Sequence, residues 1–170
     1  MDPLVTVFEI SLGANGILAD TLFRLGIGVF GLIAGGYALA RLLRAKGRSA
    51  MAFLGPAFLI IWSTFWLAAH MSMAEIVLRT RDLIALQRSG KSEVTEGIVK
   101  VGHQQPRHGH SSGDKVSISG RQFEVNYFLV TPGYRETIAH GGVLRPGVYA
   151  RLHHHDGVIL KVEIRKSGKP

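Results

Sequence analysis

Two long apolar runs occupy the first half of the chain. Leu25–Leu43 carries one charged residue, Arg41, close to its end, and Ala50–Ala69 carries none. A helix rises about 1.5 Å per residue, so a run of about 19 residues covers roughly 28 Å, which is enough for the hydrocarbon core of a bilayer. The pattern predicts a membrane hairpin with spans at about 22–43 and 50–69.

The hairpin is expected to take up residues 1–70, although parts of this region are less regular. Residues 4–18 mix β-branched residues with glycine and show no clean period, so we expect an interfacial segment of no fixed type. Pro56 interrupts the second span. We expect it to kink the helix, because ending the helix there would leave unpaired backbone groups in lipid.

Beyond residue 70 the apolar positions recur at helical spacing, at Met73, Ile76, Val77 and Ile84. This spacing predicts a connector helix within residues 71–92, which ends at the glycine and serines of positions 89–92. The helix either lies on the membrane surface, extends the second span as a stalk or packs on the domain beyond, and its default role is structural.

From residue 94 the period changes to that of β-strands. The predicted strands are residues 94–101, 115–119, 122–130, 148–154 and 158–164. Five strands in so short a segment predict a small barrel of the OB or SH3-like kind over residues 93–166, with a tail at 167–170. A rolled open sheet is the alternative. The expected fold class is thus a membrane α-hairpin followed by a soluble all-β domain.

The last two strands are predicted to form a hairpin. A two-residue loop at Asp156-Gly157 would mix the two faces of the pair. A three-residue loop starting at His155 instead pairs His154 with Val158 and produces one continuous apolar face, with Gly157 in the left-handed region. We therefore expect the three-residue loop.

Charge predicts how the hairpin crosses the membrane. The chain has 20 Lys and Arg against 12 Asp and Glu, a net charge of +8. Four of the basic residues lie in the turn between the spans, at Arg41, Arg44, Lys46 and Arg48. Since basic loops stay in the cytoplasm, we expect the β-domain outside the cytoplasm, which is the periplasm if the chain comes from a Gram-negative bacterium. Arg79, Arg81 and Arg88 beyond the second span weigh against this orientation.

Small residues in the first span predict close helix packing. Gly31 and Gly35 form a GxxxG pair. The partner of this face is either the second span of the same chain, which we favour, or a second copy or a larger membrane protein.

Several strings of the β-region carry a family resemblance. In order they are VTEGIVKV, Gly109-His110, SISGRQFEV, TPGY, AHGGVLRPGVYARL and VILKVEI. They resemble the soluble domain of an uncharacterised family of bacterial membrane proteins that share a two-span amino-terminal half. The resemblance covers about residues 20–165 and implies no activity. The architecture is also similar to that of NfeD-type membrane proteins with their OB domains.

Two glycine-rich loops, 102–114 and 131–147, carry the candidate binding residues. These are His110, Tyr134, His140, Gly141, Gly142 and Arg145. Glycine beside histidine indicates unusual backbone conformations or the close approach of another surface. The loops either form a lip that binds a partner or ligand, or use their histidines to hold their own shape.

Histidines are the other candidate ligands, because seven of the eight lie in the β-region. His153 and His155 can share a face and are weak metal candidates, whereas strand alternation turns His154 to the other face. The resembled family has an aromatic or hydroxyl-bearing residue in this region. The resemblance therefore does not imply a site at the histidine run, and no metal or cofactor is expected.

Catalytic patterns are missing from the sequence. The chain has no cysteine, no GxSxG and no phosphate-binding loop, so we expect no enzyme. The expected function is a non-catalytic, membrane-anchored binding or assembly module with a protein or envelope partner. The alternative is a cytoplasm-facing OB-like domain that binds nucleic acid or anionic lipid, with Tyr127 and Phe128 stacking bases. A domain outside the cytoplasm would make nucleic acid an unlikely partner.

Overall fold

The computed structural model describes residues 3–13, 16–45, 47–109 and 111–165. The chain divides into two compact units. One is Gly16–Val77, and the other combines Met1–Asn15 with Leu78–Pro170. The first fifteen residues, which were assigned to the membrane hairpin above, therefore group with the β-region.

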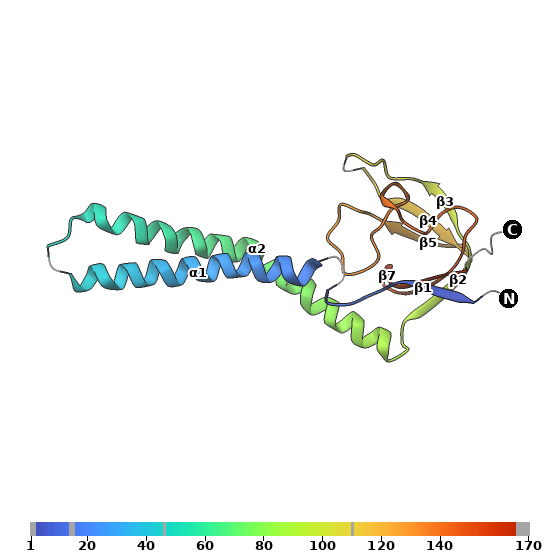
Figure 1. Ribbon diagram of the computed structural model, residues 1–170, viewed down its shortest axis with the longest axis horizontal. Helices are drawn as coiled ribbons and strands as arrows, with labels where there is room; N and C mark the ends of the chain where they lie inside the picture. The colour runs from blue at the N-terminus through green and yellow to red at the C-terminus, as the bar shows by residue number, and fades with distance from the viewer. Residues whose placement is uncertain (1–2, 14–15, 46, 110, 166–170) are drawn as a thin grey trace. The chain divides into compact units, whose positions relative to one another are not determined.

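The helices of the described residues are α1 (Ile17–Arg44), the 3-10 turn η2 (Ala50–Phe53), α2 (Leu54–Arg88) and the 3-10 turn η3 (Ile138–His140). By length and composition alone, two helical stretches of the described residues could cross a membrane, Ile17–Arg44 and Ala50–Arg88. Figure 1 shows α1 running alongside the first part of α2 as an antiparallel pair.

The second helix is longer than the sequence pattern indicated. α2 continues through His70 without a break, so the predicted connector helix is a direct extension of the helix that contains the second apolar run. No glycine or proline lies between His70 and Arg88, which leaves nothing to stop the helix. It ends where Gly90 takes a φ of 69°.

Pro56 lies near the start of this helix. Because α2 begins at Leu54, Pro56 falls in its first turn, where a backbone N–H has no intrahelical acceptor to lose. The expected mid-helix kink is therefore replaced by a change from 3-10 to α geometry at Leu54.

Glycines form the contact between the two helices. Gly28, Gly31 and Gly35 are all buried on one face of α1. A Cβ at Gly35 would lie 2.9 Å from Ile60 and 3.2 Å from the carbonyl oxygen of Pro56, and one at Gly31 would overlap Ser63 Oγ. Close backbone approach thus depends on these glycines, and their partner is the same chain's α2.

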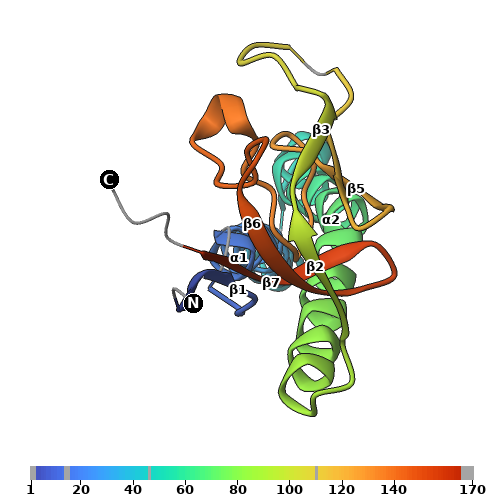
Figure 2. The ribbon, with the colours of Figure 1, turned by 90° about the vertical axis from the view of Figure 1, so that its right-hand side faces the viewer.

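Seven strands are found in the described part of the β-region and its partner segment before α1. They are β1 (Leu4–Glu9), β2 (Glu93–Ile98), β3 (Lys100–His103), β4 (Asp114–Ile118), β5 (Arg121–Val125), β6 (Tyr149–His155) and β7 (Val158–Arg165). One sheet has the order β1-β7-β6-β2 and the other the order β3-β4-β5. All strand pairings among the described residues are antiparallel (Figure 2).

The sheets do not close into a barrel, so the expectation of an OB or SH3-like barrel is wrong. The first predicted strand, 94–101, is divided at Val99 and supplies β2 to one sheet and β3 to the other. Gly97 sits next to the division with a φ of 151°, and a Cβ there would lie 2.6 Å from Ser119 Oγ. The chain can therefore pass from one sheet to the other at this point.

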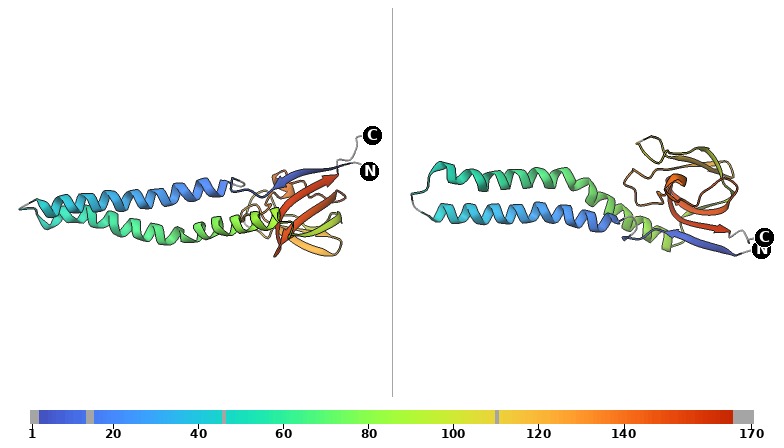
Figure 3. Two further views of the ribbon diagram at one scale, coloured as in Figure 1. Left: turned by 90° about the horizontal axis from the view of Figure 1, so that it is seen from below. Right: turned by 45° about the horizontal axis from the view of Figure 1, so that its top comes forward.

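Strand β1 comes from the segment in which no period was found. It pairs with β7, from Leu4 opposite Arg165 to Glu9 opposite Lys161 (Figure 3). The register shifts between Thr6 and Phe8, and this irregularity hides the alternation of the strand. Residues 4–9 of the segment for which no element type was predicted thus form a strand.

The β6–β7 hairpin also differs from its predicted pairing. His155 pairs with Val158 across a two-residue loop, in which Asp156 and Gly157 have φ values of 47° and 77°. Positive φ at both positions is what a type I′ turn requires. A register shift after His153 places Leu152 opposite Val162. The bulge, and not a longer loop, restores the continuous apolar face.

The main apolar core lies between the two sheets. The three-stranded sheet contributes Val116, Ile118, Phe123 and Val125, and the four-stranded sheet contributes Ala150, Leu152, Ile159 and Val162. A smaller cluster of Ile10, Leu83 and Leu160 packs the last turns of α2 onto the β-region. Leu160 is the residue that the register shift leaves without a partner on β6, and it lies in this second cluster while its neighbour Ile159 lies in the main core.

Candidate functional site

A buried carboxylate organises the loops that the sequence singled out. Asp114, at the start of β4, is 2% exposed. Its Oδ1 accepts the backbone N–H of Gln105 and its Oδ2 accepts the backbone N–H of Ile138, both at 2.7 Å. One side chain thus connects the loop before β4 to the loop before β6. Hydrogen bonds to a charged acceptor are about twice as strong as those between neutral groups.

Two amides extend this cluster to the segment after β5. The Gln105 Nε2 donates to the Ser111 carbonyl and to Asn126 Oδ1, both at 2.9 Å. Its Oε1 accepts the Tyr127 N–H at 3.1 Å, and Asn126 Oδ1 accepts the Phe128 N–H at 3.0 Å. We call Asp114, Gln105 and Asn126 the Asp114 cluster. It fixes three loops through side-chain to backbone hydrogen bonds.

Glycines and His140 shape the third loop. Gly141 has a φ of 91°, and a Cβ at Gly142 would overlap the carbonyl oxygen of Glu136. His140 Nδ1 lies 2.8 Å from Thr137 Oγ1, and its ring stacks on Tyr127 with centroids 3.7 Å apart. These contacts are those expected of a histidine that holds its own loop.

Tyr134 and Arg145 also have contacts within the loops. The Tyr134 hydroxyl accepts the Val143 N–H at 3.0 Å, and burial raises the pKa of this phenol to about 12. The Arg145 Nε donates to the Gly142 carbonyl at 3.1 Å. The structure therefore brings together Tyr134, His140, Gly141, Gly142 and Arg145, while His110 lies outside the described residues.

The same loops present apolar surface to solvent. Leu129 is 58% exposed and Val130 is 47% exposed. Beside them is a hollow of about 170 Å³ whose lining includes Leu129, Tyr134 and Val158. An apolar pair at a loop tip next to a concave surface is a feature of interaction sites.

The aromatic rings of these loops already pack against other side chains. Tyr127 is covered on its face by His140 and has the Arg135 guanidinium 5.6 Å from its ring centroid. Phe128 packs edge-on against Tyr127 at 5.4 Å. A base could stack here only after displacing these contacts.

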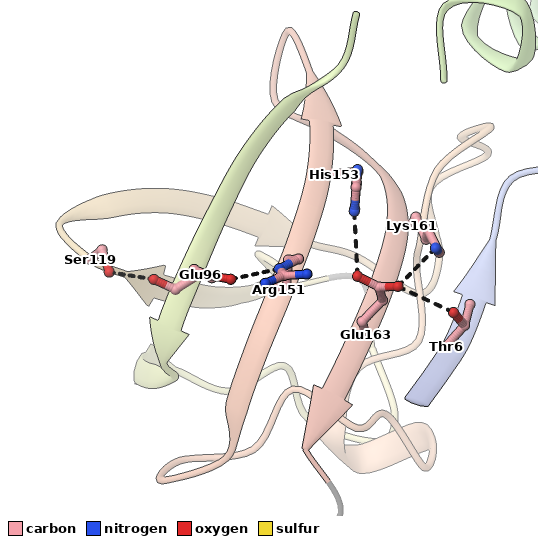
Figure 4. Close-up of polar contacts among 7 residues, drawn as sticks. All are labelled: Thr6, Glu96, Ser119, Arg151, His153, Lys161 and Glu163. Carbon is pink, nitrogen blue, oxygen red and sulfur yellow. Dashed lines mark hydrogen bonds and ion pairs between the residues drawn. The ribbon is translucent and has the colours of Figure 1, made fainter. Parts of the chain in front are cut away.

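The outer face of the four-stranded sheet carries a second polar group, drawn in Figure 4. Glu163 on β7 pairs with Lys161 at 2.8 Å and with His153 at 3.4 Å, and it accepts a hydrogen bond from Thr6 at 3.4 Å. Hydrogen bonding from Lys161 holds the pKa of the Glu163 carboxyl below its ordinary value. These residues link β1, β7 and β6 across their solvent side.

A parallel contact joins β6 to β2. The Arg151 Nε lies 2.6 Å from Glu96 Oε2, and the Glu96 carbonyl accepts the Ser119 hydroxyl at 2.7 Å (Figure 4). Ser119 comes from the β4–β5 turn, so this bond covers an otherwise open edge of β2. The arrangement is that of a cross-strand ion-pair ladder.

The three successive histidines have different surroundings. His153 faces Glu163, and His155 lies 3.5 Å from Asp156. His154 points the other way and is fully buried, with its Nε2 2.9 Å from Thr95 Oγ1 and its ring against Phe123. Burial lowers the pKa of His154. Among the residues that the structure describes, no three metal-binding side chains gather at one point.

Within the helical unit, polar contacts gather at one end of the hairpin. The Trp66 Nε1 donates to the Arg24 carbonyl at 2.9 Å, and Arg24 pairs with Asp20 at 2.8 Å. The His70 Nδ1 lies 2.8 Å from the Trp66 carbonyl and must carry the proton, because a carbonyl only accepts. His70 Nε2 is then free to accept from Arg24, 3.4 Å away.

Asp114 and Gln105 are the residues that sequence reasoning missed. They lie in a glycine- and histidine-rich stretch where no period or spacing marks them. The available signal was an aspartate directly after Gly113 and before an alternating strand, which is a common place for a side chain that accepts loop N–H groups.

Comparisons of the chain with protein-family models, with curated proteins and with solved structures find no match. The two apolar helices and the β-region of the resembled family are present, but no family is assigned.

Proposed function

We propose that the chain is a membrane-anchored, non-catalytic binding or assembly module whose β-domain presents the loops 126–147 to a protein partner. The observation that carries the proposal is the exposed apolar pair Leu129 and Val130 on loops that the Asp114 cluster holds in place. The partner is expected in the membrane or the cell envelope.

Ordered loops favour binding for an energetic reason. A flexible loop loses conformational entropy when a partner orders it, at about 0.5–1.5 kcal/mol for each immobilised side chain. Here the backbone of the loops is already held by Asp114, Gln105 and Asn126. Burial of Leu129 and Val130 then contributes about 25 cal/mol for each Å² of apolar surface removed from water.

The helical unit supports the anchoring part of the proposal. Its large side chains point outward, with Phe30 74% and Phe65 72% exposed, while glycines lie between the helices. That distribution suits a lipid environment, in which apolar side chains face outward and small residues allow close packing.

Strand pairing supports two crossings. β1 precedes both helices and β7 follows them, yet the two strands pair in one sheet. Both strands must therefore lie on the same side of any membrane that the helices cross, as a two-span hairpin requires. The basic turn at Arg41, Arg44 and Arg48 favours a cytoplasmic turn, so we place the β-domain outside the inner membrane of a bacterium.

Site-specific photo-crosslinking tests the partner surface. A photoreactive residue at position 129 is expected to capture a protein in native membranes. The matched control is position 98, because Ile98 is also apolar and is 52% exposed, but lies on β2. Equal protein capture from both positions, or none from position 129, would contradict the proposal. Leu129→Asp should abolish capture through a reporter at position 130 without changing the melting temperature.

A further inference from the structure

A shallow groove lies where the last turns of α2 meet the segment that follows β1. It has a volume of about 370 Å³, and its lining consists of Ser11, Leu12, Arg81, Ile84, Ala85 and Arg88. The buried cluster of Ile10, Leu83 and Leu160 fixes the two segments beneath it. All of these residues belong to the same compact unit.

On the side of the groove that α2 forms, two arginines lie on either side of two apolar residues. Positions 81, 84, 85 and 88 lie on one face of a helix, and on this face the two arginines enclose Ile84 and Ala85. Arg81 and Arg88 are separated by about 10 Å along the helix axis. With Leu12 opposite, the groove has an apolar floor and a cationic group at each end.

Among the described residues, the arginines that pair with a carboxylate are Arg24, Arg121 and Arg151, and those of the groove are not among them. In the β-sheets, Arg121 pairs with Glu93 and Arg151 with Glu96. Arg81 and Arg88 form no ion pair with any residue in the described part of the chain. One carboxylate, that of Glu9, lines an adjoining hollow next to Arg88 but not the groove itself.

We propose that this groove binds the headgroup of an anionic phospholipid, with the phosphate held by Arg81 and Arg88 and the adjoining glycerol and acyl carbons against Leu12 and Ile84. Guanidinium groups bind phosphate oxygens through two parallel hydrogen bonds, which makes a phosphate the complementary occupant. The apolar floor distinguishes an amphiphile from free phosphate.

The inference rests on the proposed membrane anchoring, because the occupant is a membrane lipid. Leu12 precedes the first residue of α1 by five positions, and α2 runs unbroken from its apolar part to Arg88. Both sides of the groove therefore lie close in sequence to the apolar helices.

Lipid retention by the full chain tests the proposal. The protein is purified in an uncharged detergent, so that no bilayer surface potential attracts lipid, and is titrated with phosphatidylglycerol or phosphatidylcholine while bound lipid is counted by native mass spectrometry. We expect preferential binding of phosphatidylglycerol and a loss of affinity of roughly tenfold or more in the Arg81→Gln/Arg88→Gln variant. Excess inorganic phosphate should compete only weakly.

Matched variants make the result specific. Arg79→Gln/Arg107→Gln removes the same charge from exposed positions outside the groove and should bind like the original chain. Ala85→Trp fills the groove without changing charge and should also prevent binding. Equal loss in the Arg79/Arg107 variant, equal affinity for both lipids, or full competition by inorganic phosphate would overturn the proposal.

The outcome is separable from that of the proposed function. If the chain is released from membranes by salt or alkali without detergent, membrane anchoring itself fails. If the chain needs detergent for extraction and Arg81→Gln/Arg88→Gln still binds phosphatidylglycerol normally, only the lipid groove fails.

Discussion

The helical hairpin and the β-domain distribute apolar residues in opposite ways. Between α1 and α2 the buried positions include Gly28, Gly31 and Gly35, whereas phenylalanines face outward. Between the sheets, branched apolar residues such as Ile118 and Leu152 are fully buried. One chain therefore contains two packing schemes, with glycines between the helices and branched apolar residues between the sheets.

The two units also differ in how they use buried polar atoms. In the Asp114 cluster both carboxylate oxygens and both ends of the Gln105 amide are hydrogen-bonded. In the hairpin the hydroxyls of Thr21 and Ser63 are buried without a hydrogen-bond partner among the described residues, and outside the cluster so is the Nδ1 of His154 in the β-domain. Buried polar side chains hold the loops of the β-domain in place, whereas in the hairpin the small side chains allow the two helices to pack closely.

The largest effect is expected from the β-domain's buried carboxylate. Asp114→Ala leaves two buried N–H groups without an acceptor and should lower the free energy of unfolding of the β-domain by about 3–5 kcal/mol. Hydrogen exchange of the full chain in detergent measures this, since protection should fall in β4 and in the loops 104–113 and 126–147 but not in α1.

The control for this variant is Asp114→Asn, which keeps one acceptor and should lose less stability. A similar loss of hydrogen-exchange protection in α1 and in β4 would contradict this prediction, because Asp114 would then stabilise both units and not the β-domain alone.

The next effect concerns the glycine contact in the hairpin. Gly31→Leu inserts a side chain where a Cβ already overlaps Ser63 and should destabilise the helix pair by about 1–3 kcal/mol. Trp62 and Trp66 are the chain's two tryptophans and both lie in α2, so tryptophan fluorescence reports this unit.

Gly36→Leu is the matched control, because nothing lies within 4 Å of a Cβ at that position. Fluorescence should change for Gly31→Leu and stay constant for Gly36→Leu. Equal changes would mean that the packing face of α1 is different from the one described.

A smaller effect is expected from the pH dependence of the β-domain. Burial lowers the pKa of His154 in the folded state below its ordinary value of 6.5. The unfolded chain therefore takes up a proton first, so the stability from neutral His154 is present above about pH 6.5 and is lost as the pH falls. One proton limits the slope to about 1.4 kcal/mol per pH unit.

Denaturation of the full chain between neutral and mildly acidic pH measures this slope. It should become flatter in His154→Gln and persist in His153→Gln, because His153 lies on the outer face of the sheet. If the slope disappears only in His153→Gln, the titrating group would be His153, which contacts Glu163, and not His154.

The smallest effect is expected on the outer face of the four-stranded sheet. Glu163→Gln should cost about 0.5–1 kcal/mol, since the carboxylate contacts Lys161, His153 and Thr6 while remaining partly solvated. Because the pKa of Glu163 is lowered in the folded state, its contribution is present above about pH 4.5 and is lost as the pH falls through the folded value.

Urea denaturation of the full chain checks this value. Glu96→Gln removes a more exposed ion pair with Arg151 and should cost less. A larger cost for Glu96→Gln would make the β6–β2 contact, and not the Glu163 group, the stronger link of the sheet.

The apolar runs and the strand alternation located the two apolar helices and the strands of the β4–β5 and β6–β7 hairpins, but the predicted strand 122–130 ends at Val125 in β5. These features depend on neighbouring residues, which sequence patterns report directly. The opposite orientations of His153 and His154 followed from the same alternation, and the structure has them on opposite faces.

Features that depend on distant pairing were not predicted. The alternation of β1 is interrupted by its bulge, and its partner lies at the other end of the chain. The division of 94–101 into β2 and β3 depends on contact between Gly97 and Ser119, so barrel closure could not be judged from strand count. The Asp114 cluster likewise joins residues from three loops.

The pairing of β1 with β7 has a consequence for biogenesis. Thr6 and Glu163 contact each other although they are 157 positions apart in the sequence. At a translation rate of 5–20 residues per second, β1 waits about 8 to 30 s for its partner strand. During that time both helices are synthesised, so the β-sheet can be completed only after the helical hairpin has left the ribosome. A chaperone that shields an unpaired β1 would act in this interval.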